Sequence, residues 1–137
     1  MATFISNSPD ETESFGRQFA GTVRPGDVIA LIGDLGAGKT QFVKGLVSGL
    51  GCNAAVTSPT FTLIHEYGGD RFPIFHFDFL RLEDAKEAER LGLDEYFFGN
   101  GVSVIEWAGR FPDLIPETAR WISFETKSET ERAITTK

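Results

Sequence analysis

The most constraining feature of the sequence is a glycine-rich segment, Gly33–Thr40, which matches the phosphate-loop pattern G-x-x-x-x-G-K-[S/T]. An unbroken apolar run, Val28–Ile32, precedes it and is typical of a strand buried on both faces of a parallel sheet. Apolar residues then recur at helical spacing up to Gly51 (Phe42, Val43, Leu46, Val47 and Leu50). The pattern predicts a buried strand, a tight loop and a helix, with a phosphate site at the start of the helix.

Each residue type in this segment suits phosphate binding. Glycine lets the main chain turn tightly, so that N–H groups converge on an anion without obstruction by side chains. Lys39 supplies a mobile positive charge for the outer phosphates, and Thr40 presents a hydroxyl to Mg²⁺. The sequence therefore predicts an ATP or related triphosphate site with Mg²⁺, formed by Asp34, Leu35, Gly36, Ala37, Gly38, Lys39 and Thr40.

Such a site needs a carboxylate at the end of a neighbouring strand, and two acidic residues qualify. Glu106 follows the apolar run Val102–Ile105, and Asp78 ends a segment in which His76 and Asp78 share one face. We favour Glu106 as the Mg²⁺ ligand because the run before it better suits a buried parallel strand. Asp78 is then a candidate for positioning the attacking water.

Three further features have both a structural and a functional interpretation. His76, on an apolar strand, is more typical of a satisfied core residue than of a base or ligand. Ser58, Pro59 and Thr60 precede a strand and suit an ordinary turn, but they could also form a switch segment that senses the γ-phosphate. Trp107 adjoins Glu106; a tryptophan in that position is usually a core residue, but beside a phosphate site it could cover the nucleotide.

The remaining pattern completes an α/β chain. Ser8 caps a predicted helix from about Pro9 to Gly21, with Glu11 three residues later. We expect a hairpin of 61–67 and 71–78, with Pro73 marking an edge or a bulge. Helices at 82–91 and 94–98 and strands at 102–105, 120–125 and 132–136 follow. The predicted fold is one P-loop NTPase domain over residues 1–137, a three-layer sandwich with a parallel-rich central sheet flanked by helices.

Composition narrows the function classes. The 137 residues carry a net charge of −7, which argues against direct binding of nucleic acid. The longest apolar run is far shorter than the roughly 20 residues that span a bilayer, so we expect no membrane association. One cysteine, Cys52, cannot form an intrachain disulfide, and the N-terminus does not look like a secretory signal. A cytoplasmic location is the expectation.

The motifs together resemble one family, TsaE, the small bacterial ATPase of tRNA threonylcarbamoyladenosine biosynthesis. The matching segments occur in the order and spacing of that family from about Pro9 to Ile115: Gly33–Thr40, Ser58–Leu63, His76–Asp78, Arg81–Leu82 and Ile105–Trp107. Two positions depart from the family pattern. Phe61 stands where a tyrosine is usual, and Phe79-Leu80 replaces a Leu-Tyr pair, so both lack a hydroxyl.

The resemblance implies slow ATP hydrolysis in the service of two partner proteins, TsaB and TsaD, with tRNA contacted only indirectly. It implies that Thr40 and Glu106 coordinate Mg²⁺, and that Asp78 and Trp107 matter for activity beside Lys39, the catalytic lysine of the loop. It also implies adenine contacts from the N-terminal region and from a basic residue near the C-terminus. Glu11 and Arg132 are the corresponding positions here.

Other classes remain open at this stage. A small-molecule phosphotransferase (kinase) is the main alternative, but it needs arginines over the transferred phosphate and a lid, and no arginine-rich lid segment is evident. A GTPase lacks support because no Asn-Lys-x-Asp motif is present. A scaffold with a relic phosphate loop would bind no nucleotide.

Overall fold

The computed structural model describes residues 2–34, 38–53, 55–57, 59 and 63–137. Seven strands form one sheet in this part of the chain, in the order β1-β7-β6-β2-β5-β4-β3. Their bounds are β1 Ala2–Ser6, β2 Val28–Gly33, β3 Ile64–Gly68, β4 Pro73–Asp78, β5 Val102–Glu106, β6 Arg120–Thr126 and β7 Arg132–Thr136. The inner strands β6, β2, β5 and β4 run parallel, and the outer strands pair antiparallel.

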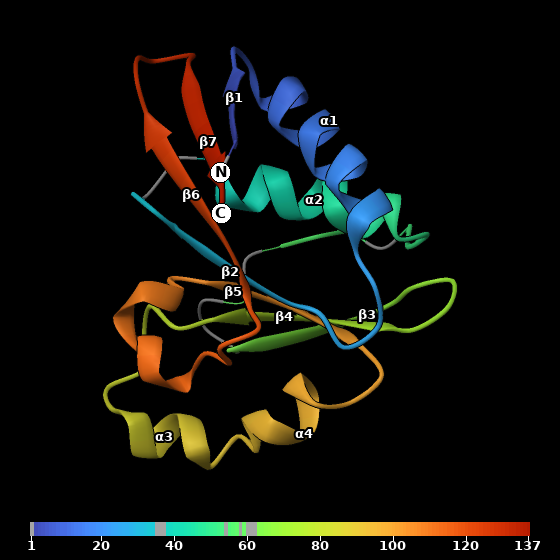
Figure 1. Ribbon diagram of the computed structural model, residues 1–137, viewed down its shortest axis with the longest axis vertical. Helices are drawn as coiled ribbons and strands as arrows, with labels where there is room; N and C mark the ends of the chain where they lie inside the picture. The colour runs from blue at the N-terminus through green and yellow to red at the C-terminus, as the bar shows by residue number, and fades with distance from the viewer. Residues whose placement is uncertain (1, 35–37, 54, 58, 60–62) are drawn as a thin grey trace.

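Helices cover both faces of this sheet (Figure 1). The α-helices are α1 Pro9–Phe19, α2 Lys39–Gly49, α3 Ala85–Glu89 and α4 Leu93–Phe97, and short 3₁₀ turns lie at Ala20–Thr22, Ala108–Arg110 and Pro112–Leu114. α1 and α2 lie over one face, and α3 and α4 over the other. Two apolar clusters fill the two interfaces, so the predicted three-layer arrangement is confirmed.

The strand at the centre has the expected character. Within β2, Val28, Ile29, Ala30 and Leu31 are all buried, with alternate residues in the two apolar clusters. The following helix buries its predicted apolar side and ends in a Schellman motif at Gly51 (φ 84°). There Cys52 N–H donates to Val47 O (3.1 Å) and Gly51 N–H to Ser48 O (3.0 Å).

Two glycines let α1 and α2 approach backbone to backbone. A Cβ added at Gly45 would lie 1.8 Å from Glu13 O, and one added at Gly16 would lie 2.2 Å from Phe42 O. Even an alanine at either position would therefore force the helices apart. This close packing fixes the start of α1 beside the start of α2.

Several predicted elements need correction. α1 ends at Phe19 rather than Gly21, and the helix predicted over 82–91 is helical only from Ala85 to Glu89, where Asp84 caps it. The edge predicted from Pro73 is wrong: β4 is an inner strand that tolerates the proline at its first residue, and β3 forms the edge. β1 has too short and too exposed a pattern to stand out in the sequence.

None of the helices in the described ranges is both long and apolar enough to cross a bilayer.

Candidate nucleotide and magnesium site

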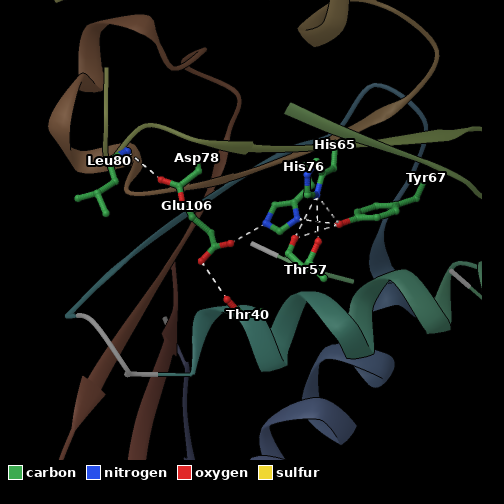
Figure 2. A network of polar contacts seen from close by, with 8 residues as sticks. All are labelled: Thr40, Thr57, His65, Tyr67, His76, Asp78, Leu80 and Glu106. Atoms are coloured by element: carbon green, nitrogen blue, oxygen red, sulfur yellow. Dashed lines mark hydrogen bonds and ion pairs between the residues drawn. The ribbon is translucent and has the colours of Figure 1, made fainter. Parts of the chain in front are cut away.

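The predicted site residues meet at one end of the sheet, where the inner parallel strands finish. β2 ends at Gly33, β4 at Asp78 and β5 at Glu106, and Asp78 and Glu106 are register partners at the ends of neighbouring parallel strands. The N-terminus of α2 lies against this end, with Thr40 facing Glu106 (Figure 2). Ligands of open α/β sheets bind in this position, outside the carboxyl ends of the strands.

Glycine is required at both described ends of the loop between β2 and α2. Gly33 has φ 150°, and a Cβ there would lie 2.5 Å from Phe124 O. Gly38, the N-cap of α2, is left-handed (φ 98°) and provides no side-chain cap for the helix. Gly38 therefore offers no side-chain acceptor to the first N–H groups of α2, whereas Ser8 accepts from Glu11 N–H at the start of α1. N–H groups at a helix start of this kind suit an anion. Leu35, Gly36 and Ala37 lie outside the described residues.

Lys39 is buried at the first position of α2. Its ammonium donates to Gly33 O (Nζ–O 2.6 Å) and lies 3.5 Å from the centroid of the Trp107 ring, a cation–π contact. Burial lowers the pKa of Lys39 from its ordinary 10.5, and the negative charges of Glu106, Asp78 and Asp34 oppose that shift. The positive charge of Lys39 is thus poorly hydrated beside the loop, and a bound phosphate would compensate for the missing hydration.

Glu106 is buried, and its two carboxylate oxygens have different neighbours. Oε1 accepts from the Thr40 hydroxyl at a long 3.4 Å, and Oε2 lies 2.6 Å from His76 Nε2. A hydroxyl and a carboxylate are hard oxygen donors, the type that Mg²⁺ takes, so the pair fits this ion. No group of three His, Cys, Asp or Glu suited to a metal occurs among the described residues. Proteins usually hold Mg²⁺ by one or two ligands of their own together with phosphates and water.

Asp78 is equally buried but is held differently. Its Oδ1 accepts from Leu80 N–H (2.8 Å), which closes a small turn after β4. Arg110 fastens the same turn, because its Nη1 donates to the carbonyl oxygens of Phe79 and Leu82 (both 2.9 Å) and of Leu80. The carboxylate therefore lies in a fixed position one strand away from Glu106.

Trp107 has a left-handed backbone (φ 58°), uncommon for a bulky residue. The conformation ends β5 abruptly and turns the indole onto Lys39. Strained backbone of this kind is concentrated at functional sites. The sequence placed Trp107 at the site, but the contact with Lys39 could not be predicted from it.

A second set of polar residues lies behind Glu106, and no sequence pattern grouped them. Tyr67 is buried on β3, with its hydroxyl 3.2 Å from His76 Nδ1 and 3.3 Å from Thr57 O (Figure 2). Burial raises the pKa of Tyr67 above 10.0, so the hydroxyl keeps its proton at neutral pH. His65 Nδ1 also lies near Thr57 O (3.2 Å). Only the register of β3 against β4, which pairs His65 with His76, brings these groups together.

The two predicted adenine contacts lie toward one corner of the sheet. Glu11 is in the first turn of α1 and accepts from Asn7 N–H (3.0 Å). Arg132 begins β7, is the register partner of Ser6, and donates to Ser128 O (2.8 Å). Gly38 lies beside Thr12 of α1, where an added Cβ would be 3.4 Å from Thr12 Cγ2. The start of α1 is thus near the start of α2.

The predicted switch residues are only partly described. Ser58 and Thr60 lie outside the described residues. Pro59 is buried, and its carbonyl accepts from Leu63 N–H (2.7 Å).

Comparison with known proteins agrees with this arrangement. The family described as "Threonylcarbamoyl adenosine biosynthesis protein TsaE" matches residues 6–134. The chain belongs to the TsaE family. The TsaE of Bacillus subtilis (strain 168), named a tRNA threonylcarbamoyladenosine biosynthesis protein, is 46% identical over 128 residues, covering 93% of this chain and 80% of that protein. The protein of the same name from Treponema pallidum is 40% identical over 131 residues, 96% of each chain.

A solved structure shares the fold. The crystal structure of Bacillus subtilis YdiB superposes with a TM-score of 0.85 at 38% identity, and the match covers 98% of this chain and 83% of that one. The architecture of this chain is therefore that of a solved structure to which it is similar.

Proposed function

We propose that this chain is a Mg²⁺-dependent P-loop ATPase that binds ATP and hydrolyses it slowly, in support of the threonylcarbamoylation of tRNA. The observation that carries the proposal is the approach of Thr40, at the start of α2, to Glu106, at the end of β5 (3.4 Å). A hydroxyl and a carboxylate that face each other at the start of a helix with a glycine N-cap suit the protein's share of a magnesium–triphosphate site.

The roles of the residues follow from their positions. Thr40 and Glu106 would hold Mg²⁺, which supplies charge neutralisation to the phosphates. Lys39 leaves its contact with Gly33 O for a phosphate oxygen, a stronger acceptor that compensates its burial better. Asp78, fixed through Leu80 and Arg110, orients or polarises the attacking water. Trp107 covers the ammonium of Lys39 and limits the access of solvent to it.

The biological role rests on the family. The relatives carry the name tRNA threonylcarbamoyladenosine biosynthesis protein, and we assign this chain to the same pathway. Its net charge of −7 suits a protein that acts through partners which themselves bind the RNA. TsaB and TsaD are the partners that we propose, with the adenosine beside the anticodon as the site of modification.

A small-molecule kinase is less well supported. Such an enzyme needs arginines directed at the transferred phosphate. Arg110 donates instead to three main-chain carbonyls of the turn after Asp78. Its role is therefore to shape the turn.

Reconstitution of the modification tests the proposal. Purified TsaB, TsaD and unmodified tRNA, with threonylcarbamoyl donor, are incubated with ATP, with and without this chain. We expect modified adenosine only when both the chain and ATP are present, and loss of the product with the Lys39→Ala variant. Full modification without the chain, or with the variant, would remove the ATPase from the pathway. A phosphorylated product from a panel of nucleosides and sugars would favour the kinase.

A further inference from the structure

The carboxylate of Glu106 is held from two sides. Thr40 approaches Oε1, and His76 approaches Oε2 at 2.6 Å, a much closer contact. His76 is fully buried on β4, and Glu106 is 3% exposed at the end of β5. The short contact therefore fixes the orientation of the carboxylate, and it leaves Oε1 directed at the N-terminus of α2 (Figure 2).

The hydrogen bonds identify the donor in the contact between His76 and Glu106. A carboxylate oxygen only accepts, so His76 Nε2 donates to Glu106. The other ring nitrogen, Nδ1, is buried with the ring, and its partner is the Tyr67 hydroxyl at 3.2 Å. That hydroxyl has one proton, within reach of both Nδ1 and Thr57 O, so the contact holds the ring in place without deciding its tautomer. Tyr67 thus fixes the orientation of the ring whose Nε2 binds Glu106.

The outer end of this chain of contacts is anchored to the main chain. The Tyr67 hydroxyl also lies 3.3 Å from Thr57 O, and the β3–β4 and β4–β5 pairings fix the spacing of the strands that carry Tyr67, His76 and Glu106. In a purely apolar setting the buried carboxylate would have no hydrogen-bond partner on this side. The contact with His76 supplies that partner and holds Oε2 in place.

We propose that His76 and Tyr67 are positioning residues for the Mg²⁺-binding carboxylate of Glu106. The inference rests on the proposed function, since it assigns the role of residues behind the same site. Groups that orient a metal ligand typically change metal affinity by about 10–100-fold when they are removed. A buried histidine with only a packing role would change stability and leave the metal affinity of the folded protein unaltered.

The test measures the Mg²⁺ concentration at the midpoint of binding of a fluorescently labelled ATP analogue, with affinity in EDTA recorded for every variant. We expect His76→Leu to raise the midpoint about 10–100-fold, and His76→Gln to restore much of the loss because its amide can donate to Glu106. Tyr67→Phe, the mildest change, should raise it several-fold. The matched control is Tyr96→Phe, the same substitution as at Tyr67, on α4 at the opposite face of the sheet, where the ring packs against Phe75 and Phe77. It should keep the wild-type midpoint.

Different outcomes would contradict the positioning role and the proposed function. The positioning role would be overturned if the Tyr67 and His76 variants had the same midpoint as the wild type. It would also be overturned if a variant lost as much affinity in EDTA as in Mg²⁺, because the loss would then not depend on the metal. Thermal unfolding without nucleotide identifies any variant that fails to fold. If His76→Leu fails to fold, the comparison of Tyr67→Phe with Tyr96→Phe decides the question. A wild-type protein whose nucleotide binding ignores Mg²⁺ would contradict the proposed function itself.

Discussion

Replacing Lys39 with methionine separates nucleotide binding from stability. The side chain keeps its length and apolar stem and loses its charge. In the nucleotide-free protein the ammonium is buried, with a lowered pKa, so its removal costs little despite the loss of contacts with Gly33 O and the Trp107 ring. We expect the free energy of unfolding to change by no more than about 1 kcal/mol, or to rise, as often happens when a functional polar residue is replaced.

Binding of ATP should respond in the opposite direction. Loss of a charged contact to phosphate costs about 2–4 kcal/mol, a roughly 30- to 900-fold weaker affinity. At an ATP concentration about 100 times the wild-type Kd, binding stabilises the wild type by about 2.7 kcal/mol. For a chain of 137 residues, 1 kcal/mol shifts Tm by about 3.5 °C. The wild type should therefore gain about 9 °C, and Lys39→Met at most about 3 °C.

The assay is thermal unfolding of both proteins with and without MgATP at one fixed concentration. A Lys39→Met protein that shows the full wild-type gain would refute the role of this lysine. A variant whose nucleotide-free Tm falls by more than about 10 °C would refute the argument that burial already disfavours the charge.

Three further predictions test other parts of the site and the fold. Glu106→Ala should raise the Mg²⁺ requirement of nucleotide binding, whereas Asp78→Ala should preserve binding and reduce ATP hydrolysis; parallel titrations and phosphate-release assays would show the reverse if the roles were exchanged. Burial lowers the pKa of Lys39, and only the protonated side chain attracts phosphate. ATP affinity, measured from pH 7 to 10, should therefore begin to fall at a lower pH than it would with an exposed lysine. Constant affinity up to pH 10 would contradict this. Gly45→Ala should lower the free energy of unfolding by about 2–4 kcal/mol in denaturant titrations, because its Cβ would meet the main chain of α1 at 1.8 Å, and Gly21→Ala, which has open space, should not.

The order of elements and the chemistry of the loop could be predicted from the sequence because both are local. A buried apolar run, a glycine-rich turn and a helical repeat lie next to one another in the chain, and the side chains that act on phosphate follow directly. The structure confirms β2, α2 and the two apolar faces. The position of Glu106 at the end of a buried parallel strand also follows from its own segment.

What depends on strand order and register could not be predicted. Tyr67 and His76 are nine residues apart on strands whose pairing alone brings them together, and Glu106 lies a further 30 residues along the chain from His76. The left-handed conformation of Trp107 and its contact with Lys39 likewise arise from packing between distant segments. Pro73 misled the prediction, because a proline at the first residue of a strand does not exclude an inner position.

The most direct test of the central claim is a crystal structure of the chain grown with Mg²⁺ and a non-hydrolysable ATP analogue. We predict density for the triphosphate against Gly33–Thr40, with a magnesium ion bound by Thr40 and Glu106 and with Lys39 turned from Gly33 O to a phosphate. An analogue bound elsewhere, or a loop that stays empty at saturating concentration with Lys39 still on Gly33 O, would contradict the account.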